Sequence, residues 1–152
     1  PFAAEEWEFA GGKSLFDRAR QEARESRIDG RPDILGSDID ARSIDLCKKH
    51  AKKAGVMVNW KVAPLKELST DKSGGLIVCN PPYGERMMEK REAEALYREM
   101  RHKFDELDNW QVSVITAYRD FERIYGKRAD KRRKLSNGGM VCTMYQYFKR
   151  NN

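Results

Sequence analysis

Short apolar runs alternate with longer amphipathic stretches along this chain, and that alternation limits the folds open to it. Four runs have the length and apolar character of strands: 34–38, 56–62, 76–79 and 112–116. Three stretches place apolar residues at helical spacing: 41–54, 89–107 and 119–125. A chain in which strands and helices take turns is typical of an α/β protein with a mostly parallel sheet.

The two ends of the chain complete this pattern. Ser14 is suited to cap a first amphipathic helix, and the segment 136–139 (Ser-Asn-Gly-Gly) is a hairpin signal between two final strand-like stretches. The hairpin predicts an antiparallel strand at one end of the sheet. The 152 residues are enough for one domain with a proper core.

Composition argues against several classes of protein. No apolar run approaches the roughly 20 residues of a membrane span, and no signal peptide opens the chain, so neither a membrane protein nor a secreted one is expected. Cys47, Cys79 and Cys142 are widely spaced, which indicates a reducing cytoplasm rather than a disulfide framework. Cys47 and His50 are only two potential ligands, so no metal site is predicted.

Positive charge is concentrated in the segment 127–134. That segment holds six basic residues and one acidic residue, in a chain whose net charge is +6. Its basic residues are Lys127, Arg128, Lys131, Arg132, Arg133 and Lys134. A concentrated basic patch is the electrostatic footprint of a polyanion-binding surface, although a solvated face would have the same composition.

Two predicted strands end in residues that suit ligand binding, which in open α/β sheets occurs beyond the carboxyl ends of strands. Asp38 closes the first strand, where its carboxylate can accept the two hydroxyls of a ribose while Ile39 packs on an adenine. Asp40 has a simpler alternative role as the N-cap of the following helix.

The second strand end, Asn80-Pro81-Pro82-Tyr83, is more specific. The prolines fix φ and remove two backbone donors, which leaves the carbonyl groups of Asn80 and Pro81 free to accept. The side-chain oxygen of Asn80 adds a third acceptor, and Tyr83 adds an aromatic face. Acceptors that converge beside such a face suit a planar group bearing an NH₂, such as the exocyclic amine of a nucleobase.

These motifs resemble those of a known enzyme family. Asn80–Tyr83 resembles the amino-methyltransferase motif of the class I S-adenosylmethionine-dependent (SAM-dependent) fold, and Gly36–Asp40 resembles its ribose-binding segment. The longer string through Gly84, Glu85 and Arg86 resembles the bacterial THUMP-containing 23S ribosomal RNA guanine-N2 methyltransferases. The segments 96–100, 125–131 and 145–147 are also similar to that family, so the resemblance covers nearly the whole chain.

The resemblance implies methyl transfer from SAM to a guanine amine of 23S ribosomal RNA. It implies that Asn80, Pro81, Pro82 and Tyr83 form the catalytic loop, and that Asp38, Ile39 and Asn80 bind the cofactor. Arg86 and the basic residues of the segment 127–134 are then the candidates for RNA binding.

Two parts of the family pattern are not found in this sequence: the first strand with its glycine-rich loop, and the THUMP domain. We therefore expect residues 1–152 to be part of a methyltransferase domain of a longer protein. The expected sheet has the class I order without its first strand, so that the strands near 34–38 and 75–79 flank a gap or pair directly.

Three alternative functions remain open from the residues. A glutamine methyltransferase that modifies proteins presents the same loop to a carboxamide, and a DNA adenine methyltransferase presents it to another base. An RNA-binding module without catalysis would not need the glycine-rich loop. The extension 84–86 and the basic segment favour RNA.

Overall fold

The computed structural model describes residues 2–28, 30, 32–84, 87–137 and 139–148. The α-helices are α1 (Gly12–Glu25), α2 (Ala41–Ala54), α3 (Met87–Asp105) and α4 (Phe121–Tyr125). The strands are β1 (Leu35–Asp38), β2 (Asn59–Val62), β3 (Gly75–Cys79), β4 (Trp110–Thr116), β5 (Lys131–Asn137) and β6 (Met140–Tyr147). The predicted α/β pattern is confirmed.

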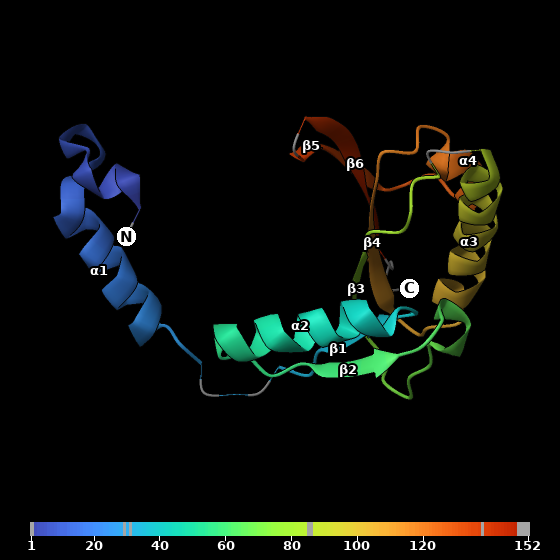
Figure 1. Cartoon of the computed structure of the whole chain (residues 1–152), viewed down its shortest axis with the longest axis horizontal. Coiled ribbons are helices and arrows are strands. Elements are labelled where there is room, and N and C mark those ends of the chain that lie inside the picture. The colour runs from blue at the N-terminus through green and yellow to red at the C-terminus, as the bar shows by residue number, and fades with distance from the viewer. Residues whose placement is uncertain (1, 29, 31, 85–86, 138, 149–152) are drawn as a thin grey trace.

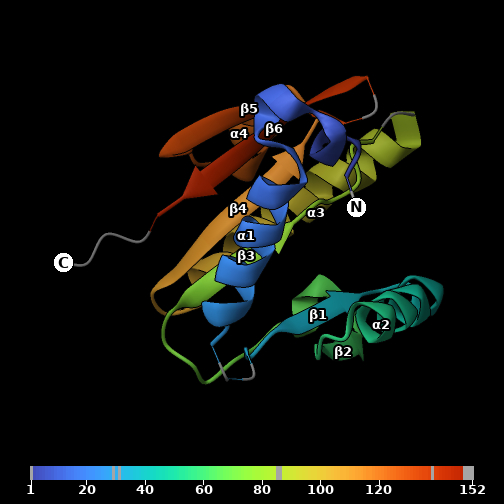
Figure 2. The ribbon, with the colours of Figure 1, turned by 90° about the vertical axis from the view of Figure 1, so that its left-hand side faces the viewer.

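The strands form two sheets, which Figures 1 and 2 show as separate bodies. One pairs β1 with β2 in parallel, and the other has the order β3-β4-β6-β5. In the described residues β1 and β3 do not pair. The first of the two expected arrangements is therefore observed, in which these strands flank a gap.

Three expectations need correction. The antiparallel strand is β6, which lies between β4 and β5 and not at the edge of the sheet. The strand expected from residue 56 begins at Asn59, because Val56 follows directly on the left-handed cap at Gly55 that ends α2. Helix α1 begins at Gly12, so Ser14 lies inside it and its hydroxyl donates to the carbonyl of Gly11.

Only one face of the four-stranded sheet is covered by helices in the described residues. Helices α3 and α4 pack on the face that carries Val112, Val114, Tyr145 and Tyr147, and aromatic rings fill that core. Leu76 and Val78 point to the other face, because side chains alternate along a strand. These two side chains are 60% and 58% exposed. A continuous apolar run such as 76–79 is typical of a strand buried on both faces, and that interpretation is wrong for β3.

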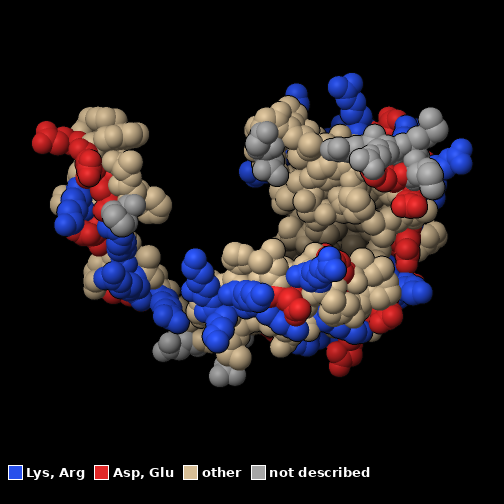
Figure 3. All heavy atoms as spheres, viewed as in Figure 1, with Lys and Arg blue, Asp and Glu red and all other residues tan. Residues whose placement is uncertain are grey.

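The N-terminal arm, residues 2–26, stands apart from the sheets across an open space (Figures 1 and 3). An ion pair between Glu5 and Arg20 and the neighbouring rings of Phe2 and Phe16 tie its first turn to α1. None of the residues of α1 is buried. No helix among the described residues combines the length and the apolarity needed to cross a bilayer.

Helix α2 packs on the β1–β2 pair and fixes where β1 ends. The side chain of Asp40 accepts from the backbone N–H groups of Arg42 and Ser43, so its predicted capping role is confirmed. The N–H of Arg42 is the main reason that the pKa of Asp40 lies below its usual value. Ile44, almost fully buried, anchors the helix.

Candidate active site

The loop Asn80–Tyr83 continues directly from β3. Parallel pairing with β4 holds β3 as far as Cys79, which lies opposite Val114. Pro81 is buried, whereas Asn80 and Pro82 are exposed. The sheet therefore presents the loop at its carboxyl edge, the edge at which open α/β sheets bind ligands.

A buried tyrosine of α3 contacts this loop. The hydroxyl of Tyr97 donates to the carbonyl oxygen of Pro82 at 2.7 Å. Tyr97 is separated from Pro82 by 15 positions, so no local sequence pattern predicts this contact. The carbonyl of Pro82 is thereby occupied within the protein.

Tyr83 uses its hydroxyl as well as its ring. The hydroxyl donates to Oδ1 of Asn80 at 2.6 Å, and the thiol of Cys142 on β6 donates to the oxygen of Tyr83 at 3.7 Å. Burial, and next the Cys142 contact, raise the pKa of Tyr83. The hydroxyl therefore stays protonated and orients the Asn80 amide.

Two acceptors in the loop remain for a ligand. An amide oxygen has two lone pairs, so Oδ1 of Asn80 can accept a second hydrogen bond beside that of Tyr83. No hydrogen bond within the described part of the chain occupies the carbonyl of Pro81. An NH₂ group can donate one hydrogen to each of these acceptors.

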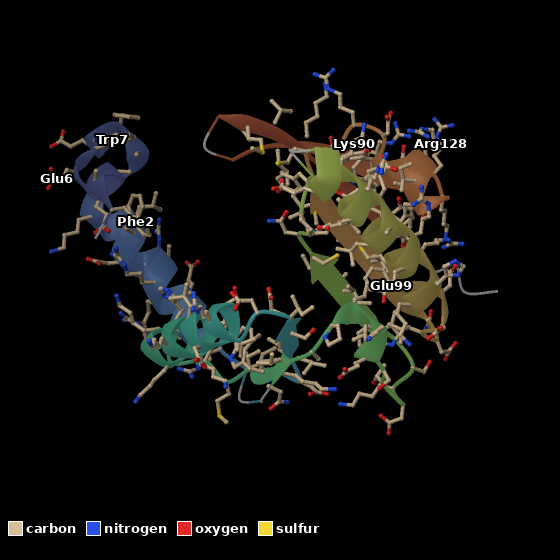
Figure 4. The ribbon with its side chains drawn as sticks, turned by 45° about the vertical axis from the view of Figure 1, so that its right-hand side comes forward. Phe2, Glu6, Trp7, Lys90, Glu99 and Arg128 are labelled. Atoms are coloured by element: carbon tan, nitrogen blue, oxygen red, sulfur yellow. The ribbon has the colours of Figure 1, made fainter. Side chains whose placement is uncertain are left out.

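Gly84 closes the loop at a point where only glycine fits. Its φ is +66°, and a Cβ there would lie 2.6 Å from the Cα of Lys90. This close approach brings the first turns of α3 beside the loop. The Nζ of Lys90 lies 5.7 Å from the ring centre of Tyr118, which follows β4 (Lys90 is labelled in Figure 4). Lys90 is a basic residue near the loop that the sequence analysis did not select.

Asp38 ends β1 with its carboxylate exposed. Its Oδ1 accepts from the backbone N–H of Asp40 at 2.8 Å, which leaves Oδ2 without a partner among the described residues. The neighbouring side chain of Ile39 is 75% exposed. A carboxylate oxygen beside an open apolar side chain fits the ribose and adenine of a nucleoside.

The thiol of Cys79 does not suit nucleophilic chemistry. Burial raises its pKa to about 12, so the reactive thiolate is scarce near neutral pH. In the described residues no group of three or more His, Cys, Asp or Glu side chains could hold a metal ion.

The basic segment does not form one uniform surface. Arg132 forms an ion pair with Glu122 of α4, with 2.5 Å between Nη2 and Oε2. Lys127 lies near Trp110, the first residue of β4, and is therefore at the opposite end of that strand from the loop Asn80–Tyr83. The backbone carbonyl of Lys127 accepts from the hydroxyl of Tyr147. Figure 4 shows Arg128 on the same side of the molecule as α4.

The remaining basic residues of β5 have free charges. Lys131, Arg133 and Lys134 are exposed, and no described carboxylate lies within ion-pair distance of them. Lys134 pairs with Thr143, which pairs with Thr116, so it lies level with the carboxyl end of β4. Arg86 lies outside the described residues.

Helix α2 provides a second basic surface that the sequence analysis did not single out. Its exposed basic side chains are Arg42, Lys48, Lys49, Lys52 and Lys53. Figure 3 shows Lys and Arg side chains gathered along this helix. These basic residues are visible in the sequence. Acidic residues elsewhere in the first half of the chain offset their positive charge, so the net charge of that half does not reveal them.

Comparison with known proteins identifies the chain's relatives. A family model described as "UPF0020: RMKL-like, methyltransferase domain" matches residues 3–146. YpsC of Bacillus subtilis (strain 168), a candidate RNA methyltransferase, is 41% identical over 150 residues, which are 97% of this chain and 39% of YpsC. The ribosomal RNA large subunit methyltransferase K/L of Legionella pneumophila (strain Corby) is 32% identical over 135 residues, which are 87% of this chain and 19% of that protein.

A solved structure agrees with these sequence matches. SMU.472, a candidate methyltransferase in complex with SAH (S-adenosylhomocysteine), matches with a TM-score of 0.83 at 36% identity. The match covers 100% of this chain and 41% of that one. The predicted class I methyltransferase fold is confirmed, and the chain spans less than half the length of each of these proteins.

Proposed function

We propose that this chain, which belongs to the family of RMKL-like methyltransferase domains (UPF0020), transfers a methyl group from SAM to the exocyclic N2 amine of a guanine in 23S ribosomal RNA. We propose further that it acts as part of a longer protein with an N-terminal THUMP domain. The observation that carries the proposal is the loop after β3, where the Asn80 side chain and the Pro81 carbonyl offer two acceptors while Tyr97 occupies the carbonyl of Pro82.

SAM supplies an activated methyl group, so the task left to the protein is positioning. Oδ1 of Asn80 and the carbonyl of Pro81 accept the two hydrogens of the amine and direct its nitrogen lone pair outward. When bound, SAM would supply the methyl group as its S–C bond breaks and would leave as S-adenosylhomocysteine, while the methylated nitrogen gives one proton to water.

Tyr83 and Asp38 have separate tasks in this proposal. The ring of Tyr83 stacks on the extruded guanine, a contact worth about 1–3 kcal/mol, comparable to the cost of unstacking a base. Asp38 accepts from the ribose hydroxyls of SAM, and Ile39 packs on its adenine. The residues at the end of β1 therefore fit the ribose and adenine of the cofactor.

RNA is favoured over the alternative substrates by charge. Lys131, Arg133 and Lys134 present unpaired charges on one strand, and Lys90 lies beside the loop. A polyanionic substrate would gain affinity from all four, whereas a glutamine side chain of a protein would not.

The proposal is tested by incubating the full-length protein with labelled SAM and unmethylated 23S ribosomal RNA, then digesting the RNA to nucleosides. The expected product is N2-methylguanosine. In parallel reactions with DNA or a protein in place of the RNA, N6-methyladenine or methylglutamine would establish one of the alternatives. RNA binding without methyl transfer would establish a binding module.

A further inference from the structure

The fully buried hydroxyl of Tyr97 links the amine-binding loop to the end of a neighbouring strand. Tyr97 lies on α3 with its ring against Phe121 and Tyr118, at centroid distances of 5.0 and 5.4 Å. Its oxygen lies 2.7 Å from the carbonyl of Pro82 and 3.4 Å from Oγ1 of Thr116. Thr116 is the last residue of β4 and is itself 1% exposed.

The direction of these hydrogen bonds follows from counting protons. A carbonyl oxygen can only accept, so the single hydroxyl proton of Tyr97 goes to Pro82. Thr116 must then donate its own proton to the Tyr97 oxygen. Oγ1 of Thr116 in turn accepts from the backbone N–H of Tyr118 at 3.1 Å. One directed chain therefore runs from the backbone after β4 to the loop after β3.

Burial keeps this chain intact. Removal from water raises the pKa of Tyr97, so the hydroxyl remains a donor. Its ring is fixed by the aromatic contacts, which leaves the hydroxyl little freedom to move. The carbonyl of Pro82 is therefore held in a fixed position relative to Thr116 at the end of β4.

We propose that Tyr97 and Thr116 are positioning residues that set the orientation of the amine acceptors in the loop. This inference rests on the proposed function. The prolines leave the loop few free torsions, so an anchor at Pro82 also sets the direction of the Pro81 carbonyl and the Asn80 side chain. Tyr97 is not proposed to contact SAM or the RNA. It affects the reaction only through the position of the loop.

The test compares two deletions of a buried tyrosine hydroxyl in the full-length protein. Tyr97→Phe removes the donor to Pro82 and keeps the ring. Tyr147→Phe is the matched control, because its hydroxyl also donates from the same core to a backbone carbonyl, that of Lys127, at the other end of β4. Thermal unfolding of both variants measures the cost in stability.

We expect Tyr97→Phe to slow single-turnover methylation by about 10- to 100-fold, the scale at which a misplacement near 1 Å acts. The dissociation constants for SAM and RNA should change by less than about threefold. Tyr147→Phe should unfold at a similar temperature and keep its methylation rate within about threefold. Equal loss of rate in the two variants would overturn the inference.

A double-mutant cycle tests whether Thr116 acts through Tyr97. Thr116→Val should lower the rate less than Tyr97→Phe does. The double variant should be no slower than Tyr97→Phe alone, because the Thr116 donor has no role once its acceptor is gone. Fully multiplicative rate losses would show that the two residues act separately and would contradict the chain.

Hydrogen exchange provides a readout that does not depend on methylation. The amides of Tyr83 and Gly84 should exchange faster in Tyr97→Phe than in Tyr147→Phe. If the wild-type protein methylates no RNA, the proposed function fails, and the exchange rates still decide the positioning inference. Equal exchange in both variants would reject that inference even where methylation is observed.

Discussion

Asn80 and Asp38 end two different strands, so their substitutions should affect different steps. Asn80→Ala removes an amine acceptor and should lower the single-turnover rate by about 100-fold or more, with a much smaller fall in SAM affinity than in Asp38→Ala. Asp38→Ala should weaken SAM binding by about 10- to 100-fold, the range for hydrogen bonds to a charged group. Quenched single-turnover assays measure the methylation rate, and calorimetry measures the affinity for SAM.

A matched substitution sharpens this prediction. Asp38→Asn keeps an oxygen for the backbone N–H of Asp40 and removes the charge. Its loss of SAM affinity should therefore approach that of Asp38→Ala while the end of β1 stays in place. Near-normal methylation by Asn80→Ala would refute the assignment of the loop.

Tyr83 combines two interactions that two substitutions can separate. Tyr83→Phe keeps the ring and removes the hydrogen bond to Asn80, so the methylation rate should fall by about 3- to 10-fold, the cost of one net hydrogen bond. Tyr83→Ala should in addition weaken RNA binding, because the stacking face is lost. Titration of RNA against each variant, beside single-turnover rates, distinguishes the two losses. If Tyr83→Phe lost as much RNA affinity as Tyr83→Ala, the result would argue against a stacking role for the ring.

At the scale of elements, strand β5 carries basic residues with different surroundings. Lys131 and Arg133 share one face of the strand and are unpaired, whereas Arg132 on the other face is paired with Glu122. Replacing both Lys131 and Arg133 by Gln should reduce the salt slope of RNA binding by about 1.4, at roughly 0.7 per charge for a single strand. RNA affinity measured over a salt series checks the value.

Arg132→Gln is the matched control for this experiment. It removes one charge from the same strand but breaks the contact with α4, so it should lower the unfolding temperature and leave the salt slope nearly unchanged. An unchanged slope in the Lys131/Arg133 variant would mean that β5 is a solvated face. A slope that falls for Arg132→Gln would mean that RNA displaces Glu122.

At the scale of the whole molecule, the two candidate cofactor contacts belong to separate sheets. Asp38 lies on the β1–β2 pair and Asn80 follows the four-stranded sheet, and no described strand joins them. Leu35, Leu76 and Val78 are all more than half exposed on these sheets. We expect these side chains to contact further structure in the full-length protein.

Calorimetry of SAM binding tests the consequence. The full-length protein should bind SAM at least about 10-fold more tightly than this 152-residue chain alone, because a cofactor that spans both sheets must otherwise fix their relative position. Asp38→Ala should reduce the affinity of the full-length protein more than that of the isolated chain. Equal SAM affinities for the full-length protein and the 152-residue chain would show that the chain by itself holds Asp38 and Asn80 in the arrangement that SAM requires.

Local sequence determined the elements and the identity of the loop. Helix α2 has the predicted bounds because Asp40 and Gly55 supply its caps within a few residues of the ends they fix. The loop Asn80–Tyr83 was predictable because two prolines restrict the backbone wherever they occur. The class of fold followed from the alternation of strand and helix.

Tertiary structure decided which groups of the site are free and which are occupied. The pairing of Tyr97 with Pro82, of Cys142 with Tyr83 and of Arg132 with Glu122 joins residues that are 10 to 59 positions apart. Such contacts depend on how helices pack on the sheet and on strand register, which no local pattern specifies. Strand β3 is a further example. Its apolar run predicts burial, but the exposure of Leu76 and Val78 depends on which elements surround the strand.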